Sequence, residues 1–140
     1  MSERSPSAIL FMCGMNAIRS PLAEAIARAR LPNVVVRSAG VHTGTRDPFV
    51  DAVIAERGLP ADEYGPQDFH DIGDGLFDIV VALSEDAHEE ARELARTVDM
   101  QVEFWPMPDP STTEGRREQV LDAYRALADA LERRITDRFG

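Results

Sequence analysis

Short apolar runs alternate with segments of helical pattern along the chain, and this alternation limits the fold more than any other feature. The runs are nearly continuous in apolar residues, which is typical of strands buried on both faces of a parallel sheet. We expect strands at Ala8–Cys13, Val34–Ser38, Phe77–Leu83 and Gln101–Trp105. We expect helices at Pro21–Arg30, Pro48–Arg57, Glu85 to about Thr97, and about Arg116 to Arg138. The sequence therefore predicts an α/β protein with three α/β/α layers and a four-stranded parallel sheet.

Short polar residues and glycine mark the expected ends of these helices. Ser20 is suited to be the N-cap of the first helix, and Ser84 of the third. Asp47 precedes the proline that opens the second helix, and Gly58 follows the end of that helix, where a left-handed glycine is common. The segment 59–76 has scattered Pro, Gly and Asp and is predicted to be mostly loop.

Length and composition limit the class of protein. A chain of 140 residues is expected to form a single domain over 1–140. The net charge of −10 argues against DNA or RNA as a partner. No apolar stretch approaches the length of a membrane span, and the first apolar run is too short for a signal peptide, so we expect no membrane partner. The oligomeric state is left open.

The single cysteine, Cys13, lies between the first expected strand and the first expected helix, in the run ILFMCGMNAIRSPLAEA. Unpaired N–H groups at the start of a helix favour an anion such as phosphate. The same field, together with Arg19, favours the thiolate of Cys13. Arg19 can hold two phosphate oxygens with its planar guanidinium group, and the Ser20 hydroxyl can donate a hydrogen bond to the sulfur. This pattern indicates phosphoryl transfer through a cysteinyl-phosphate.

A buried cysteine that packs as a small apolar side chain is the simpler interpretation of Cys13, because buried thiols are common and usually inert. The expected topology favours a functional interpretation. The loops that follow the strands lie at the carboxyl edge of the sheet, where parallel α/β proteins bind ligands. One cysteine excludes an intramolecular disulfide, and a reduced thiol makes the cytoplasm the expected location.

Asp109 is the candidate acid, in the proline-rich loop PMPDP after the last expected strand. A phosphatase needs a group that protonates the leaving oxygen and later activates water, and one carboxyl group can do both in turn. Pro110 keeps Asp109 extended and stiffens the loop. An ordinary Asp-Pro turn is the alternative interpretation.

With these residues the chain resembles the low-molecular-weight protein tyrosine phosphatases and their arsenate-reductase relatives. The resemblance covers nearly the whole chain and depends on CGMNAIRSPLAEA, VRSAGVHTG, FDIVVALS and PDP. It implies a flavodoxin-like sheet between helices, with Cys13 as the nucleophile, Arg19 as the phosphate ligand and Asp109 as the acid. The phosphate-binding loop that it implies contains Gly14, Met15, Asn16, Ala17, Ile18, Arg19 and Ser20.

The loop departs from the usual family pattern, Cys-x-Gly-Asn-x-Cys-Arg-Ser. Gly14 comes one place early, Met15 stands at the glycine position, and Ile18 replaces the second cysteine. Met15 would be strained if its position requires a positive φ. Ser111 and Thr112 stand where relatives often have the aromatic pair that flanks phosphotyrosine. Hydrolysis of phosphomonoesters is therefore better supported by the sequence than any particular substrate.

Three functions remain open at this point. The first and favoured one is a cysteine-dependent phosphatase that acts on phosphotyrosine in proteins or on a small phosphomonoester. The second is an arsenate reductase that uses an external thiol, and the third is a non-catalytic phosphate-binding module. We expect no cofactor and no metal ion, because the three histidines are scattered. His42 and His88 are expected to be solvated, His70 has no evident partner, and Trp105 could line the pocket or lie in the core.

Overall fold

The computed structural model describes residues 6–15, 17–60, 67 and 77–140. Its sheet confirms the expected topology of parallel strands, in the order β2-β1-β3-β4. The strands are β1 (Ala8–Cys13), β2 (Val35–Gly40), β3 (Ile79–Ala82) and β4 (Gln101–Phe104). β1 lies inside the sheet between β2 and β3, and the residue that ends it, Cys13, is paired with Gly40 of β2.

The helices confirm the expected order, with boundaries that differ by a few residues. They are α1 (Arg19–Arg30), α2 (Pro48–Glu56), α3 (Glu85–Leu94) and α4 (Arg117–Phe139). A short 3-10 helix, η2 (Pro110–Thr112), follows the proline-rich loop. None of the helices in the described ranges is long and apolar enough to cross a membrane.

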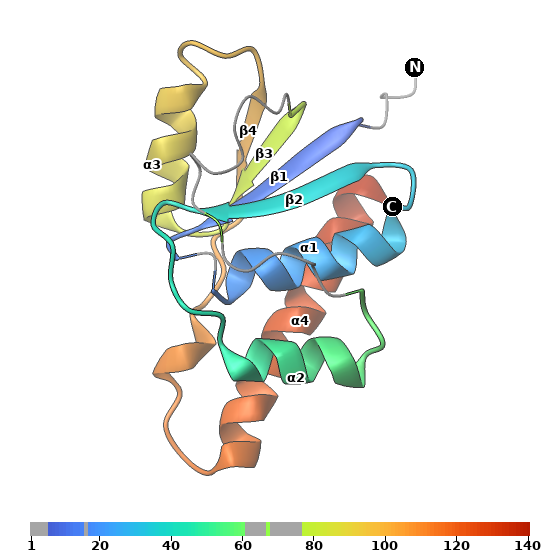
Figure 1. Cartoon of the computed structure of the whole chain (residues 1–140), viewed down its shortest axis with the longest axis vertical. Helices are drawn as coiled ribbons and strands as arrows, with labels where there is room; N and C mark the ends of the chain where they lie inside the picture. Colours follow the sequence, from blue (N-terminus) through green and yellow to red (C-terminus); the bar gives the residue numbers. More distant parts are fainter. Residues whose placement is uncertain (1–5, 16, 61–66, 68–76) are drawn as a thin grey trace.

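The helices form one layer on each face of the sheet. α1, α2 and α4 lie on one side of the strands and α3 lies on the other (Figure 1). Because successive side chains of a strand point to opposite faces, β1 contributes Ile9, Phe11 and Cys13 to the first core and Leu10 and Met12 to the second. The pleat of β1 therefore directs the Cys13 side chain toward α1.

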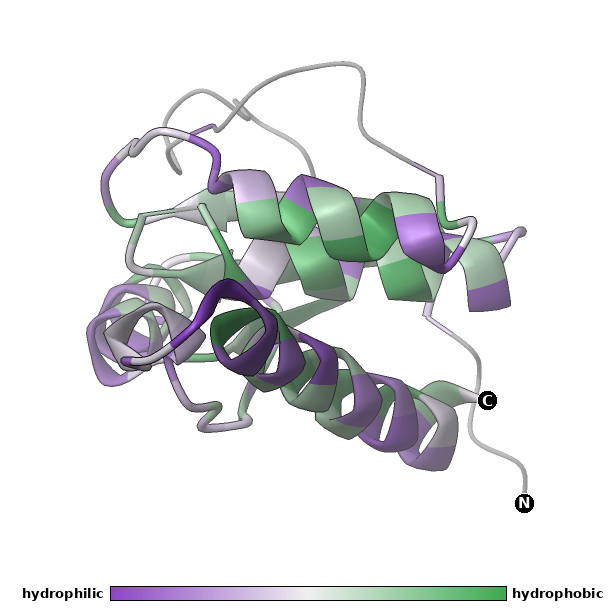
Figure 2. Ribbon diagram, turned by 90° about the horizontal axis from the view of Figure 1, so that it is seen from below, coloured by the Kyte–Doolittle hydropathy of each residue, from purple (hydrophilic) through white to green (hydrophobic). Residues whose placement is uncertain are grey.

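α4 is the longest helix and covers the core along one side. Its buried side chains recur at helical spacing, and they are Leu121, Tyr124, Leu127, Ala128, Leu131 and Ile135. Figure 2 shows hydrophilic and hydrophobic residues on different sides of this helix, which ends at the C-terminus. Trp105 is 1% exposed and packs edge-on against Phe11, which places it in the core rather than in a pocket.

The prediction that Ser20 caps α1 was wrong. The helix begins two residues earlier than predicted, its N-cap position is Ile18, and no side chain there bonds to the helix. Ser20 is buried inside the first turn, where its hydroxyl contacts Cys13 instead of a free backbone N–H. The hydroxyl is therefore available to the sulfur because it does not cap the helix.

Two other predicted helix signals are confirmed. Asp47 is the N-cap of α2 and accepts a hydrogen bond from the N–H of Phe49 at 2.8 Å. Gly58 follows the end of α2 with a φ of 63°, the left-handed conformation that glycine adopts without strain. The predicted loop 59–76 falls largely outside the described residues, and so does His70.

Candidate active site

A pocket of about 290 Å³ opens where the loops that follow the strands meet, at the carboxyl edge of the sheet. It is formed by the loop after β1, the first turn of α3 and the loop after β4. Its lining residues are Cys13, Gly14, Met15, Ala17, Ile18, Arg19, Asp86, Asp109 and Ser111. Of the residues predicted to act together, Cys13, Arg19 and Asp109 therefore all line one pocket, whereas Asn16 lies outside the described residues.

Cys13 lies at the floor of this pocket with only 2% of its surface exposed. Its Sγ is 3.0 Å from the Oγ of Ser20. The Ser20 hydroxyl also donates a hydrogen bond to the carbonyl oxygen of Ala39 at 3.4 Å. Burial agrees with the simpler interpretation of an inert thiol. The contact with the buried Ser20 hydroxyl, at a cysteine that lines a pocket, agrees with the functional interpretation.

The loop after β1 directs its carbonyl groups away from the pocket. The carbonyl oxygens of Cys13, Gly14 and Met15 accept hydrogen bonds from the N–H groups of residues 41, 42 and 44, at 3.1, 2.9 and 2.9 Å. The carbonyl of Ala17 accepts a longer bond, 3.4 Å, from the N–H of Asp47. The segment after β2 thus holds the outer side of the loop.

The N–H groups of this loop, unlike its carbonyl groups, have no hydrogen-bond partners among the described residues. Those of Gly14, Met15, Ala17, Ile18 and Arg19 donate to no other residue in the part of the chain that the structure describes. Unpaired N–H groups in a tight loop that leads into a helix attract an anion, because their partial positive charges converge. The loop can therefore bind a phosphate or an arsenate group above Cys13.

Arg19 connects this loop to the loop after β4. One terminal nitrogen of its guanidinium group donates to the carbonyl oxygen of Met107 at 3.1 Å. The segment that carries Asp109 is thereby tied to the segment that carries Cys13. A guanidinium group has five N–H donors, so this one bond leaves Arg19 able to bind two oxygens of an anion.

Asp109 caps η2 and also borders the pocket. Its Oδ1 accepts hydrogen bonds from the N–H of Ser111 at 2.9 Å and from the Ser111 hydroxyl at 2.6 Å. Its Oδ2 has no partner within the described ranges and is free for a ligand. The turn interpretation and the functional interpretation of Asp109 are thus compatible, since each uses a different oxygen.

The surroundings of Asp109 favour its charged form. Partial burial raises the pKa of the carboxyl group, but the two hydrogen bonds from Ser111 and the charge of Arg19 outweigh burial and hold the pKa below its usual value. Asp109 is therefore a carboxylate in the free protein at neutral pH. A bound phosphate dianion would oppose this effect, because a nearby negative charge favours the protonated carboxyl group.

Asp47 is another carboxylate near this edge of the sheet, but both of its oxygens are engaged elsewhere. Oδ1 caps α2, and Oδ2 accepts a 2.6 Å hydrogen bond from the hydroxyl of Tyr124. Burial, this bond and the charges of Asp47 and Asp109 raise the pKa of Tyr124, so the phenol keeps its proton and remains a donor. Asp47 does not line the pocket, which leaves Asp109 as the better-placed acid.

Two departures of the loop from the family pattern, Gly14 and Met15, have a neighbour that accommodates them. A Cβ atom added to Gly14 would lie 2.9 Å from Oδ2 of Asp86, so the early glycine leaves room for this carboxylate. A Cβ atom added to Gly44 would lie 3.0 Å from the Cβ of Met15, so that glycine leaves room for the methionine. Met15 is 49% exposed at the pocket mouth. The altered loop is therefore packed consistently with its surroundings.

Sequence analysis did not identify Asp86 as a pocket residue, and it named Ser111 only as the residue that replaces an aromatic one. An aspartate in the first turn of a helix and a serine after Asp-Pro are both common for local reasons. The expected position of the Ser84 helix at the carboxyl edge was the one signal that could have found Asp86. The prediction that His88 is merely solvated was wrong, because its ring stacks on Phe104 with centroids 4.4 Å apart, whereas His42 is exposed as expected.

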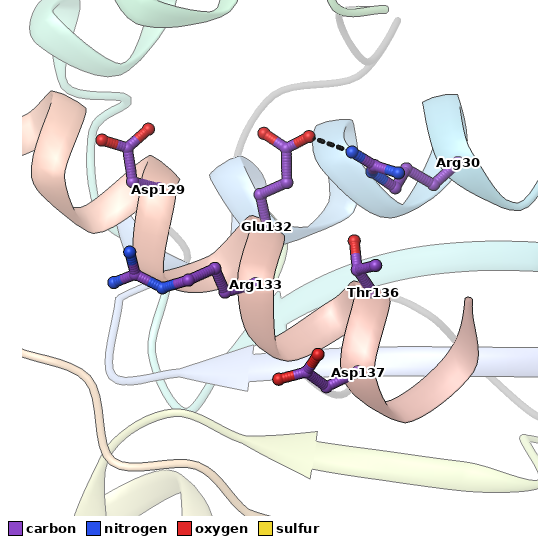
Figure 3. Close-up of a pocket in the computed structure, with 6 residues that line it drawn as sticks. All are labelled: Arg30, Asp129, Glu132, Arg133, Thr136 and Asp137. Carbon is purple, nitrogen blue, oxygen red and sulfur yellow. Dashed lines mark hydrogen bonds and ion pairs between the residues drawn. The ribbon is translucent and has the colours of Figure 1, made fainter.

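A second pocket, of about 400 Å³, lies between the ends of α1 and α4, away from Cys13. Figure 3 shows that Arg30 of α1 and Glu132 of α4 point toward each other and form an ion pair. Asp129 and Glu132 also pair with Arg57, at 2.9 and 3.8 Å. These paired charges join helices to one another, which gives this pocket a structural explanation.

The parallel three-layer fold and an anion-binding loop that begins with a cysteine define a class of cysteine-dependent phosphatases and arsenate reductases. A comparison with protein families matches residues 8–138 to the family described as low molecular weight phosphotyrosine protein phosphatase. The chain belongs to this family. The expected resemblance is confirmed.

Individual relatives agree with this assignment. The chain is 43% identical to the low molecular weight protein-tyrosine-phosphatase Etp of Escherichia coli K12 over 56 residues, which are 40% of this chain and 37% of that protein. The fold is similar to that of the tyrosine phosphatase AmsI of Erwinia amylovora, with a TM-score of 0.76, 21% identity and coverage of 97% and 93% of the two chains. It is also similar to an arsenate reductase from Archaeoglobus fulgidus, with a TM-score of 0.72, 27% identity and coverage of 92% and 96%.

Proposed function

We propose that this protein hydrolyses phosphotyrosine or a related phosphomonoester through a cysteinyl-phosphate intermediate. The observation that supports this most is the arrangement of three groups around one pocket: a cysteine at its floor, an arginine beside it and a carboxylate at its mouth. Membership of the phosphatase family agrees with this chemistry. The roles of individual residues follow from their positions.

Cys13 would attack phosphorus and Arg19 would hold the phosphoryl group. A new S–P bond forms as the P–O bond to the leaving group breaks, and the loop N–H groups with Arg19 stabilise the charge on the equatorial oxygens. The remaining loop residues, Gly14, Met15, Asn16, Ala17, Ile18 and Ser20, would surround the anion. In the second step water attacks phosphorus and the thiolate leaves, aided by a hydrogen bond that the neighbouring Ser20 hydroxyl would donate to the sulfur.

Asp109 would transfer protons in both steps. As the acid, it protonates the leaving oxygen, and its free Oδ2 is the oxygen that faces the ligand. As a carboxylate, it then accepts a proton from the attacking water. Its low pKa in the free protein suits the second role, and a bound phosphate dianion would raise that pKa and so allow the first.

Arsenate reduction with an external thiol is the second candidate. The 27% identity with the Archaeoglobus fulgidus arsenate reductase supports it, and the same loop would bind arsenate. The chain has one cysteine, so a resolving thiol would have to come from another molecule, such as glutathione. A non-catalytic phosphate-binding module is a weaker candidate, because Cys13, Arg19 and Asp109 line the same pocket.

One pair of assays separates these candidates. Purified protein is tested first with p-nitrophenyl phosphate and a phosphotyrosine peptide, and then with arsenate plus glutathione. If the wild type releases phosphate from these substrates and Cys13→Ser does not, the result supports the phosphatase. Thiol-dependent arsenite formation without phosphatase activity supports the reductase, and phosphate binding with neither activity supports the binding module. The cytoplasmic location remains a prediction that depends on the need for a reduced thiol.

A further inference from the structure

Asp86 places a second carboxylate in the wall of a pocket suited to an anion. It is the second residue of α3, and it lines the pocket together with Cys13, Arg19 and Asp109. Its Oδ1 accepts hydrogen bonds from the N–H of Ala87, at 2.9 Å, and from the hydroxyl of Ser84. Its Oδ2 has no partner in the described part of the chain and is the oxygen nearest Gly14.

The charges around this pocket do not suit a phosphate alone. Among the described residues that line it, Arg19 is the one cation, whereas Asp86 and Asp109 are both carboxylates. Asp109 has a proposed role in proton transfer, but Asp86 has none. A carboxylate at the mouth repels a phosphate dianion, so it weakens binding unless the substrate itself brings a positive charge there.

Helix capping alone does not explain this arrangement. Ser84 is the N-cap of α3, and Asp86 adds only its Oδ1, which accepts from the N–H of Ala87. The other oxygen lies so close to Gly14 that any residue with a Cβ atom at position 14 would meet it at 2.9 Å. The loop that binds the anion is thus shaped to leave Oδ2 at the pocket wall.

The apolar part of the wall is also small. Met15 supplies an exposed thioether at the mouth, and no aromatic side chain is among the described residues that line the pocket. A phosphorylated side chain therefore meets a flexible apolar group and a carboxylate rather than an aromatic clamp. Selectivity is expected to come from charge more than from ring stacking.

We propose that Asp86 selects phosphorylated substrates that carry a guanidinium or ammonium group beside the phosphoryl group, as in a phosphopeptide with Arg or Lys next to the phosphorylated residue. The cation pairs with Oδ2 of Asp86 while the phosphate binds over Cys13. This inference rests on the proposed phosphatase function and names its substrate class. Asp86 is a specificity-determining residue, since it touches the substrate but not the reacting atoms.

The test compares three phosphotyrosine peptides of one sequence, with Arg, Gln or Glu on both sides of the phosphotyrosine. kcat/KM is measured for the wild type, Asp86→Asn and Glu85→Gln. Asn keeps an oxygen for the Ala87 N–H, so the variant should fold, and its Tm checks this. Glu85 is the matched control, because it is an exposed acid of the same helical turn that does not line the pocket.

The wild type is expected to prefer the Arg peptide over the Glu peptide by about two- to fivefold, the range for an exposed ion pair. The preference should shrink as the salt concentration rises. Asp86→Asn should abolish it and Glu85→Gln should retain it. Equal kcat/KM values for the three peptides in the wild type, or an unchanged preference in folded Asp86→Asn, would overturn the proposal.

A binding measurement separates this inference from the proposed function. The same peptides are titrated into Cys13→Ser and into the double variant Cys13→Ser/Asp86→Asn. If the wild type hydrolyses no phosphomonoester, the proposed function fails, but tighter binding of the Arg peptide that depends on Asp86 still supports the selection of a cation. If hydrolysis occurs and neither rate nor binding depends on flanking charge, the inference alone fails.

Discussion

The hydroxyl of Ser20 lies 3.0 Å from the sulfur of Cys13, although seven residues separate them along the chain. The turn from β1 into α1 brings them together, and the carbonyl of Ala39 on the neighbouring strand also contacts the hydroxyl. A donor held beside the sulfur stabilises a thiolate. This stabilisation matters most in the second step of the reaction, in which the thiolate is the leaving group.

Ser20→Ala should slow the second step of the reaction more than the first. Loss of a hydrogen bond to a charged group is expected to lower kcat by about ten- to hundredfold. With p-nitrophenyl phosphate, stopped-flow measurements should show a burst of nitrophenolate followed by a slow steady state. A variant with wild-type kcat and no burst would show that Ser20 does not assist the sulfur.

Arg19→Lys should be severely impaired, although it keeps the positive charge. Lysine lacks the planar fork that binds two phosphate oxygens, and it cannot hold the Met107 carbonyl at the same time. We expect kcat/KM to fall by at least about a hundredfold, and inhibition by inorganic phosphate to weaken. Arg96→Lys is the control, because Arg96 is exposed in the turn after α3 and pairs with Glu93. Near-wild-type activity of Arg19→Lys would contradict the role of Arg19.

Ser111→Ala should move the basic limb of the pH profile to higher pH. Ser111 stabilises the charged form of Asp109, so loss of its hydroxyl should raise the pKa of that carboxyl group. The protonated acid then persists to higher pH, and kcat/KM should decline later as pH rises. Thr112→Ala is the control, since Thr112 bonds the Asp109 carbonyl and not the carboxylate. If the basic limb does not move in Ser111→Ala, the group whose deprotonation causes it is not Asp109.

Tyr124→Phe should destabilise the protein more than it affects catalysis. The Tyr124 side chain is buried and its hydroxyl donates to Asp47 at 2.6 Å, so loss of the hydroxyl leaves a partly buried carboxylate oxygen unpaired. The expected loss of stability is about 1–3 kcal/mol, measured by urea unfolding. The ring contact with Phe49 is kept, so the packing changes little. An unchanged unfolding midpoint would show that the Tyr124–Asp47 bond contributes nothing.

The order of strands and helices could be predicted because each depends on local pattern. Continuous apolar runs locate the strands, and Asp47 and Gly58 mark the ends of α2 through their own backbone chemistry. Boundaries were less certain: β2 continues to Gly40 and β3 stops at Ala82, because pairing with β1 decides where strand structure ends. The single domain over 1–140 stays a prediction.

Contacts between distant segments could not be predicted in the same way. Asp86 approaches Gly14 and Arg19 reaches Met107 only because the strand order brings these loops together. A serine before a helix predicts a cap at Ser20, and only the position of the sulfur shows that the hydroxyl has another partner. The candidate site was thus predictable in its residue types and its edge of the sheet, but not in its contacts.

Trapping the intermediate on Cys13 tests the central claim most directly. The protein is mixed with p-nitrophenyl phosphate, quenched in acid during turnover, digested and analysed by mass spectrometry. We predict a phosphoryl group on the peptide that contains Cys13, more of it in Ser20→Ala, and none in Cys13→Ser, which should still bind phosphate but not turn over. Substrate hydrolysis by Cys13→Ser at the wild-type rate, or turnover with no phosphorylated Cys13 peptide in either the wild type or Ser20→Ala, would contradict the account.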